Sequence, residues 1–296
     1  MTIPNGTRPG PAWLFCPADR PERFAKAAAA ADVVILDLED GVAPRDKASA
    51  RRALLDTPLD PARTVVRINP AVDPEQQRDL EALSGTEYTT VMLPKSEHAW
   101  HITALAPLHI VALVETPRGV MAAGDLAAAG NTAGMMWGAE DLIASLGGGS
   151  SRTADGTYRD VARHTRSTVL LAAASFDRFV LDAVHLDIAD LDGLGREAAD
   201  AAAIGFTATA CIHPTQVPVI RNAYRPAAED IHWANSVLVA ARTERGVFAF
   251  DGRMVDAPLL RHAEAIIRRS TPGSVPGAAA GTGTSFRAAA PKRPQG

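Results

Sequence analysis

Two apolar runs of the chain end in carboxylate side chains. His109–Val114 is followed directly by Glu115, and Gly134–Trp137 is followed shortly by Asp141. A short continuous apolar run is typical of a buried parallel strand, whose carboxyl end faces the ligand crevice. Buried carboxylates are costly unless they are paired or hold a cation. Because acidic groups on two neighbouring strands suit a hard divalent ion such as Mg²⁺, the pair predicts an enzyme with a metal site.

Polar side chains also follow three earlier apolar runs. Glu39 and Asp40 come after the second run, Arg67 lies near the end of the third, and Lys95 follows the fourth. Arginine suits a carboxylate or a developing oxyanion, because its planar fork donates two parallel hydrogen bonds. Each residue alone has a structural explanation, such as a helix cap, an ion pair or a solvated side chain. Their recurrence after buried strands favours one site for a cation and an anionic, oxygen-rich substrate.

Three further segments have less specific chemistry. Gly138 and Ala139 would leave backbone N–H groups bare at a helix start, where a carboxylate can bind. The Gly- and Ser-rich stretch Gly147–Gly156 lacks the lysine of a P-loop, so we expect a flexible loop at the site. His213 is ambiguous between packing and substrate contact. The only cysteines, Cys16 and Cys211, are too few for a disulfide framework and are expected to be buried thiols.

Apolar runs alternate with Ala-rich helical stretches along most of the sequence. The strand candidates are Trp13–Cys16, Val33–Leu38, Thr64–Ile68, Thr90–Leu93, His109–Val114, Gly134–Trp137, Ala183–Leu186 and Thr207–Ile212. The helix candidates are Pro21–Ala31, Asp46–Leu55, Glu75–Leu83, Gly119–Ala129, Tyr158–Ser175, Gly193–Ile204, Pro218–Tyr224, Glu229–Arg245 and Pro258–Arg269. This alternation predicts a (β/α)8 TIM barrel, with a doubly wound sheet as the alternative. Candidate site residues after many different strands favour the barrel, since an open sheet uses one switch point.

Composition and length set the remaining expectations. With 296 residues and 47% hydrophobic content, the chain can bury a large core. A net charge of −4 gives no reason to expect nucleic acid or an anionic membrane as partner. Without a signal-like or membrane-spanning run, we expect a cytoplasmic protein. We expect a barrel domain over residues 12–225, a C-terminal helical extension with a short hairpin over 226–269, and a disordered tail over 270–296.

In ordered combination, several motifs resemble the citrate lyase β-subunit-like branch of the HpcH/HpaI aldolase superfamily. They are LFCPADRPERFAKA (14–27), VILDLEDGV (34–42), VVRIN (65–69), VMLPK (91–95), ALVET (112–116), WGAEDL (137–142), CIHPTQ (211–216) and FDGRMVDAP (250–258). The resemblance covers residues 12–269 and is greatest to stand-alone members that act on free acyl-CoA esters. It implies a homotrimeric (β/α)8 barrel that is a Mg²⁺-dependent carbon–carbon lyase. Mn²⁺ is an alternative ion, since it accepts the same oxygen ligands.

The resemblance also implies roles for single residues. By motif position, Glu115 and Asp141 would be the metal ligands, and Arg67 would bind a substrate oxygen. Glu39 and Asp40 would support Arg67 and the metal-bound waters.

Further residues are implied around the substrate and its coenzyme A moiety. Asp256, in the extension, would act as general acid in the site of a neighbouring subunit. Gly138, Ala139 and Glu140 would contact the substrate. The coenzyme A channel would be lined by Arg20, Arg23, Lys26, Ile212, His213 and Pro214.

These parts imply cleavage or formation of a 3-hydroxyacyl-CoA, giving acetyl-CoA and a keto acid. Malyl-, citramalyl- and 3-hydroxy-3-methylglutaryl-CoA all remain open, because one methyl group changes binding by only about 1–3 kcal/mol. Two alternatives remain beside this function. One is a pyruvate-type aldolase that does not use coenzyme A, and the other is a citrate lyase complex subunit that acts on an acyl-carrier thioester.

Overall fold

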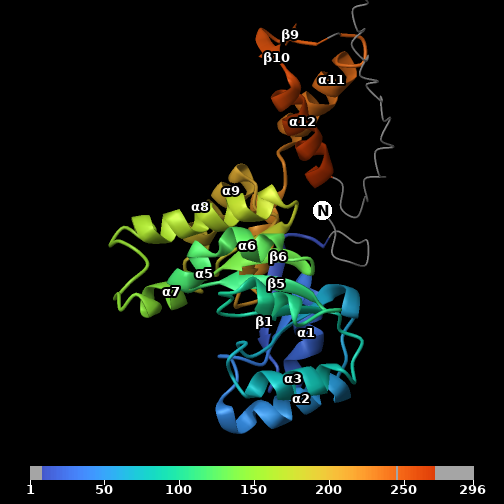
Figure 1. Ribbon diagram of the computed structural model, residues 1–296. Coiled ribbons are helices and arrows are strands. Elements are labelled where there is room, and N and C mark those ends of the chain that lie inside the picture. The colour runs from blue at the N-terminus through green and yellow to red at the C-terminus, as the bar shows by residue number, and fades with distance from the viewer. Residues whose placement is uncertain (1–8, 245, 271–296) are drawn as a thin grey trace, which may run out of the picture.

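The structure is a computed structural model, and it describes residues 9–244 and 246–270. Within this part of the chain, parallel strands close into an eight-stranded barrel in sequence order (Figure 1). The strands are β1 (Ala12–Pro17), β2 (Val33–Asp37), β3 (Thr64–Arg67), β4 (Thr90–Leu93), β5 (His109–Val114), β6 (Thr132–Trp137), β7 (Phe179–Asp182) and β8 (Ala208–Cys211). Pairing of β1 with both β2 and β8 closes the barrel. The predicted (β/α)8 barrel is confirmed, and the doubly wound sheet is excluded.

Helices connect the strands and cover the barrel. They are α1 (Phe24–Ala30), α2 (Lys47–Asp56), α3 (Glu75–Leu83), α4 (Ala99–Thr103), α5 (Pro117–Met121), α6 (Ala123–Ala128), α7 (Ala139–Ser145), α8 (Asp160–Ser175), α9 (Leu191–Ile204) and α10 (Gln216–Tyr224). Short 3₁₀ turns lie at Pro21–Arg23, Pro44–Asp46 and Pro61–Arg63. In each of them the proline lies in the first turn, where its missing N–H is harmless.

Several elements differ from the sequence prediction. The seventh strand is Phe179–Asp182 and not Ala183–Leu186. The stretch from Phe179 to Leu186 is nearly continuous in apolar residues, so periodicity alone could not locate the strand within it. The predicted helix Gly119–Ala129 is two helices, α5 and α6, which break at Ala122. The short helices α4 and α7 were not predicted.

Two apolar layers fill the barrel and its surroundings, as the period of two along each strand requires. Inward-facing residues form a cluster inside the barrel that includes Trp13, Ile35, Val65, Leu113 and Phe179. Outward-facing residues form the larger cluster beneath the helices. The alternation continues to the strand ends. The residues two positions beyond Ile35, Val65 and Leu113 are Asp37, Arg67 and Glu115, and we therefore expect these three at one mouth of the barrel.

One glycine is required inside the barrel. A Cβ atom at Gly134 would lie 2.2 Å from the ring of Phe179, so any larger residue would displace this ring. Phe179 in turn packs on Trp13, with 5.4 Å between ring centroids. Cys16 and Cys211 are free and buried, as predicted.

A separate unit follows the barrel. It consists of α11 (Ala228–Ala240), the hairpin β9 (Phe248–Phe250) and β10 (Arg253–Val255), and α12 (Ala257–Ser270). It has its own small apolar cluster, and Figure 1 shows it standing apart from the barrel strands. The hairpin turns at Asp251-Gly252 with φ of 47° and 73°, as a two-residue turn of the favoured hand requires.

The C-terminal boundary of the ordered extension differs slightly from the prediction, because Ser270 still belongs to α12. The rest of the predicted tail, 271–296, lies outside the described residues. Among the helices of the described ranges, none combines the length and the apolar character needed to span a bilayer.

Candidate active site at the barrel mouth

Arg67, at the end of β3, is held by two carboxylates of neighbouring strand ends. Its Nε and Nη2 donate to the two oxygens of Asp37 at 2.7 and 2.6 Å. Its Nη1 lies 2.8 Å from Oε2 of Glu39. The ring of Phe15 lies below the guanidinium group, 5.0 Å away. Burial opposes the charge of Arg67, but the adjacent Asp37 and Glu39 raise its pKa, so the arginine stays cationic.

Asp37 is a site residue that the sequence prediction missed. The resemblance implied that Glu39 and Asp40 support Arg67. Glu39 does contact Arg67, but the bidentate partner of Arg67 is Asp37. Asp37 also accepts hydrogen bonds from the backbone N–H groups of Glu39 and Gly41, each at 2.9 Å. A Cβ atom at position 41 would lie 2.4 Å from Oδ2 of Asp37, so the turn needs glycine there. The signal was present in the sequence, since Asp37 follows Ile35 on the inward face of the strand.

Lys95 follows β4 and contacts acidic residues from several elements. Its Nζ donates to Oε1 of Glu39 at 2.5 Å and lies 3.5 Å from Asp40 and 3.7 Å from Asp141. Its backbone N–H donates to Oε1 of Glu115 at 3.0 Å. The structure therefore brings together Arg67 and the four carboxylates that the sequence predicted at one mouth.

Glu115 is almost fully buried where β5 ends, against the backbone of Gly138. A Cβ atom at position 138 would lie 2.7 Å from Oε2 of Glu115, so only glycine leaves room for this carboxylate. Burial, with the neighbouring charges of Asp141 and Glu39, raises the pKa of Glu115 to about 8. Lys95 and Arg67 offset this effect only in part. A bound cation would stabilise the ionised form.

The predicted metal ligands fit Mg²⁺ with one qualification about their number. Glu115 is buried and short of positive charge, and Asp141 in the first turn of α7 is partly exposed. No group of three Asp, Glu, His or Cys side chains is arranged to hold a metal ion among residues 9–244 and 246–270. Mg²⁺ commonly binds through one or two carboxylates and completes its shell with waters and substrate, so a two-carboxylate site suits it.

Other predicted substrate contacts have mixed outcomes. Gly138 does not offer a bare backbone donor, because its N–H donates to the carbonyl of Val114 at 3.0 Å. Ala139 begins α7, and no side chain caps this helix start. Glu140 is exposed and accepts a hydrogen bond from Ser151 at 2.6 Å, so it contacts the following loop.

A buried polar network supports the backbone beside Glu39. Lys47 of α2 donates to the carbonyls of Leu38 and Glu39 at 2.7 and 3.1 Å, and to the side chain of Asn69 at 2.6 Å. Asn69 donates to the fully buried Asp79, which also binds Arg51. These residues lie on segments that are far apart in sequence, so their association was not visible before the fold was known.

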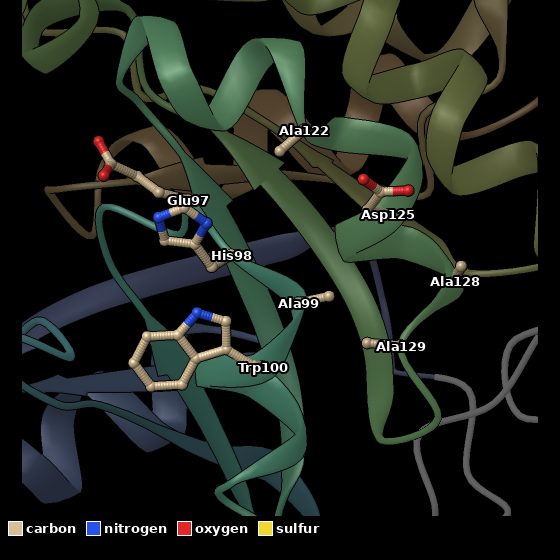
Figure 2. Close-up of a pocket in the computed structure, with 8 residues that line it drawn as sticks. All are labelled: Glu97, His98, Ala99, Trp100, Ala122, Asp125, Ala128 and Ala129. Atoms are coloured by element: carbon tan, nitrogen blue, oxygen red, sulfur yellow. The ribbon is translucent and has the colours of Figure 1, made fainter.

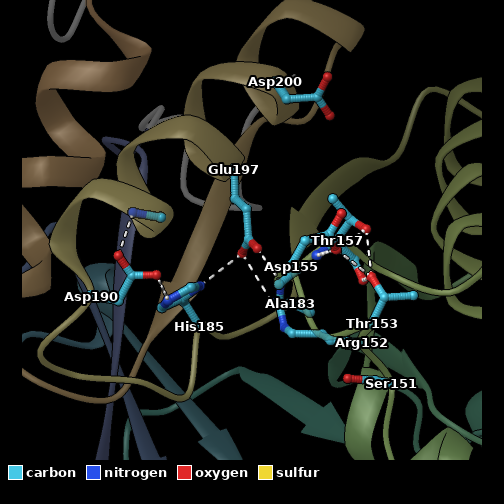
Figure 3. A network of polar contacts seen from close by, with 12 residues as sticks. Ser151, Arg152, Thr153, Asp155, Thr157, Ala183, His185, Asp190, Glu197 and Asp200 are labelled. Atoms are coloured by element: carbon cyan, nitrogen blue, oxygen red, sulfur yellow. Dashed lines mark hydrogen bonds and ion pairs between the residues drawn. The ribbon is translucent and has the colours of Figure 1, made fainter.

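A second network holds the loop that follows α7 (Figure 3). Arg152 pairs with Glu197 of α9 and lies 3.8 Å from the centroid of the Tyr158 ring. Glu197 also contacts Nδ1 of His185 at 3.0 Å. The sequence predicted a flexible loop over Gly147–Gly156, but from Ser151 onward it is anchored. The anchor was missed because Arg152 and Glu197 belong to different βα units.

The predicted coenzyme A residues lie on two surface segments. Arg20 and Arg23 lie just before α1 and Lys26 lies on it, and all three side chains are exposed. Arg20 and Arg23 contact the neighbouring Asp19 and Glu22. His213 lies in the turn after β8, where its N–H and that of Ile212 donate to Oε1 of Gln216 at 3.2 and 3.0 Å. Ile212, His213 and Pro214 are all partly exposed. The buried Gln216 sets the shape of this turn and was not predicted.

Asp256 lies in the separate C-terminal unit. Its side chain accepts a hydrogen bond from the backbone N–H of Leu259 at 3.1 Å, and it thereby caps the start of α12. Within the described part of the chain, Asp256 makes no hydrogen bond or ion pair with Arg67, Glu115 or Asp141. The structure of one chain thus does not bring Asp256 to the mouth.

A shallow pocket of about 420 Å³ lies away from these residues (Figure 2). It is lined by the segment after β4 and by α6, with Glu97, His98, Trp100 and Asp125 among its side chains. Trp100 is mostly exposed there. None of the predicted site residues lines this pocket.

Comparisons with known families match most of the chain. Residues 12–214 match the model described as HpcH/HpaI aldolase/citrate lyase. Residues 157–274 match a model described as a C–C bond lyase of the TIM-barrel fold.

Similar proteins and structures have also been characterised. A citrate lyase subunit beta-like protein of Mycobacterium tuberculosis is 68% identical over 88% of this chain and 96% of its own length. The human mitochondrial citramalyl-CoA lyase is 30% identical over 89% of this chain and 86% of its own. A crystal structure of CitE from M. tuberculosis, in complex with magnesium, acetoacetate and coenzyme A, superposes with a TM-score of 0.85. It is 68% identical, and the match covers 88% of this chain and 98% of that one.

Proposed function

The chain belongs to the HpcH/HpaI aldolase/citrate lyase family of carbon–carbon lyases, and on this premise we propose its substrate and its catalytic groups. We propose that it cleaves or forms a 3-hydroxyacyl-CoA thioester in a Mg²⁺-dependent retro-aldol or Claisen-type reaction. The products of cleavage are acetyl-CoA and a keto acid. Malyl-, citramalyl- and 3-hydroxy-3-methylglutaryl-CoA are the candidate substrates, and citramalyl-CoA is supported by the human relative.

The observation that carries the proposal is the buried Glu115, whose charge is incompletely compensated, next to Asp141 at the mouth of the barrel. In this proposal Glu115 and Asp141 hold Mg²⁺. The ion would polarise a substrate oxygen and stabilise the negative charge that develops on it. The bound magnesium of the similar CitE structure supports Mg²⁺ as the ion.

Arg67 is proposed to bind the oxygen on which charge develops as the carbon–carbon bond breaks. Asp37 and Glu39 fix its guanidinium group, so the donor is already oriented before the reaction begins. Glu39 is itself held by Lys95, and its backbone is held by Lys47. Asp40 is more exposed, and we propose that it contacts water or substrate at the rim.

The departing acetyl-CoA enolate needs a proton donor. We propose that Asp256 of a neighbouring copy supplies it, since the Asp256 of the same chain lies in the separate unit. This requires an oligomer, for which the predicted homotrimer is the proposed state. The coenzyme A moiety would pass along Arg20, Arg23, Lys26 and the turn Ile212–Pro214. These three basic side chains are exposed and can reach phosphates.

The test is a panel of 3-hydroxyacyl-CoA esters assayed with Mg²⁺ and with EDTA, with release of acetyl-CoA as the measured signal. We expect turnover of at least one ester with Mg²⁺, loss of it with EDTA, and loss of it in Glu115→Gln. An acyl-carrier subunit would act only when a carrier thioester replaces the coenzyme A ester. A pyruvate-type aldolase would cleave the free hydroxy acid at an equal rate.

A further inference from the structure

Four carboxylates at the barrel mouth, those of Glu39, Asp40, Glu115 and Asp141, form an acidic cluster. Lys95, a cation with a long and flexible side chain, lies within this cluster. We propose that Lys95 is an internal counter-ion that shares Asp141 with the divalent metal, so that metal binding displaces the Lys95 ammonium from Asp141 toward Glu39 and Asp40. This inference rests on the metal site of the proposed function. It assigns Lys95 a role in metal affinity and in the stability of the metal-free site.

The contacts of Lys95 span the whole cluster. Its Nζ donates to Glu39 at 2.5 Å and lies 3.7 Å from Oδ1 of Asp141. Asp40 lies 3.5 Å from the same Nζ. Glu39 and Asp40 are not proposed metal ligands, whereas Asp141 is. One ammonium group therefore bridges the metal-binding and the supporting carboxylates.

The backbone of Lys95 is fixed in an uncommon conformation. Its φ of 48° lies in the left-handed region, which residues other than glycine rarely adopt. In this conformation the N–H of Lys95 donates to Glu115 while the side chain reaches Glu39. The following N–H, of Ser96, donates to the carbonyl of Leu113 at 3.0 Å. Strained backbone of this kind persists where surrounding contacts impose it, and here these contacts are with the segment that carries Glu115.

The exchange follows from the charges and their spacing. A divalent ion bound by Glu115 and Asp141 would repel an ammonium group that contacts one of its ligands. Glu39 already accepts a hydrogen bond from the ammonium at 2.5 Å, and about a third of the Lys95 side chain is exposed, so the ammonium can withdraw from Asp141 and keep its contact with Glu39. Arg67 cannot act as this exchangeable counter-ion, because Asp37 and Glu39 hold its guanidinium group. Lys95 therefore keeps the carboxylates together without metal and competes with the metal for Asp141.

The experiment compares Mg²⁺ affinity by isothermal titration calorimetry for the full chain and for Lys95→Met, both first stripped with EDTA. We expect Lys95→Met to bind Mg²⁺ about tenfold more tightly, because one repulsive charge is removed near the ion. In the metal-free state we expect a lower Tm for Lys95→Met, and a larger rise of Tm on adding Mg²⁺. Lys95→Arg, which keeps the charge, should retain the wild-type affinity within about threefold.

Arg163→Met is the control for the loss of one positive charge, because Arg163 is exposed on α8 and pairs with Asp160. We expect its Mg²⁺ affinity to stay within about twofold of wild type. The inference is overturned if Lys95→Met binds Mg²⁺ no more tightly than wild type, or if Arg163→Met gains as much affinity. Lys95→Gln gives the same comparison if the Met variant does not fold.

The failure of this inference can be told apart from failure of the proposed function. Binding without turnover of any thioester would remove the proposed function and leave the Lys95 comparison valid. Turnover of a thioester by the wild type, with an unchanged Mg²⁺ affinity in Lys95→Met, would support the proposed function and overturn the inference about Lys95.

Discussion

At the scale of single residues, the site depends on how buried charges are compensated. Arg67 and Asp37 form a bidentate pair, and Lys95 and Glu39 form a second pair beside it. Among the described residues Glu115 has no comparable cationic partner, and burial raises its pKa. Two cations thus serve five carboxylates when Asp40 and Asp141 are counted with them. This excess of negative charge is what a divalent ion would correct.

The first prediction concerns Glu115→Gln in EDTA. Burial raises the pKa of Glu115 to about 8 in the folded chain, whereas its ordinary pKa, which the unfolded chain has, is 4.5. Stability is thus lost as pH rises between these values, by up to about 1.4 kcal/mol per pH unit. The variant lacks this loss. Its advantage over wild type in urea unfolding should grow from pH 5 to pH 8 and then level off. A constant difference would contradict the burial of this charge.

The second prediction concerns Arg67→Lys. A lysine cannot hold both oxygens of Asp37 and also face Glu39, so the donor for the substrate oxygen loses its orientation. We expect kcat/KM on the active thioester to fall by about 10²–10³-fold at saturating Mg²⁺. Arg45→Lys is the control, because this exposed side chain pairs with its neighbour Asp46, and the variant should leave the kinetics unchanged. Equal activity of Arg67→Lys and wild type would argue against its role.

At the scale of elements, the strand ends and the turns after them determine the geometry. The period of two directs Asp37, Arg67 and Glu115 inward from β2, β3 and β5. The turn after β6 must then pass close to Glu115, and Gly138 makes this approach possible. The buried network around Lys47, Asn69 and Asp79 joins α2, β3 and α3 behind the site. These contacts link helix packing to the position of Glu39.

The third prediction concerns Gly138→Ala. The added methyl group would overlap Glu115, so we expect a loss of stability of about 1–3 kcal/mol and weaker Mg²⁺ binding. Urea unfolding and calorimetric titration measure the two effects. Gly124→Ala in α6 is the control, because no atom outside its two chain neighbours and the backbone of its own helix lies within 4 Å of the added Cβ. That variant should be as stable as wild type or more stable by about 0.5–1 kcal/mol.

The fourth prediction concerns the loop after α7. Arg152→Ala removes the contacts with Glu197 and with the ring of Tyr158, so the loop should open more often. We expect faster hydrogen–deuterium exchange in residues 151–158 with little change elsewhere. Arg163→Ala, which removes an exposed pair with Asp160, should not change the exchange rate. Unchanged protection in Arg152→Ala would show that this pair does not anchor the loop.

At the scale of the whole molecule, the chain combines a closed barrel with a separate C-terminal unit. The unit has its own apolar cluster, and Arg269 of the unit donates a hydrogen bond to the carbonyl of Ala202 in α9. Asp256 caps α12 in this unit and does not lie in the mouth of its own barrel. If Asp256 acts in catalysis, the active unit must contain more than one copy.

The fifth prediction tests this arrangement by mixing two inactive variants, Asp256→Asn and Glu115→Gln, after reversible subunit exchange. A hybrid site can combine Glu115 of one copy with Asp256 of another, so part of the wild-type activity should return. Each variant alone, taken through the same exchange, is the control and should remain inactive. If both functional residues had to come from one chain, mixing would restore nothing.

The sequence by itself determined the barrel and most of the mouth. Continuous apolar runs and the polar residues that end them are local features, so Glu39, Arg67, Lys95, Glu115 and Asp141 could be predicted from the chain alone. The alternation of inward-facing residues along the second strand also points to Asp37, which the sequence prediction did not include. The seventh strand was misplaced because its apolar run is longer than the strand.

Only the tertiary structure decided which groups pair with one another. The bidentate partner of Arg67, the contact of Lys95 with carboxylates from several elements, and the anchoring of Arg152 on Glu197 join residues that are distant in sequence. Such contacts exist only when the barrel closes and brings separate strand ends and helices together. The raised pKa of Glu115 has the same origin, since burial and neighbouring charge are properties of the fold and not of the local sequence.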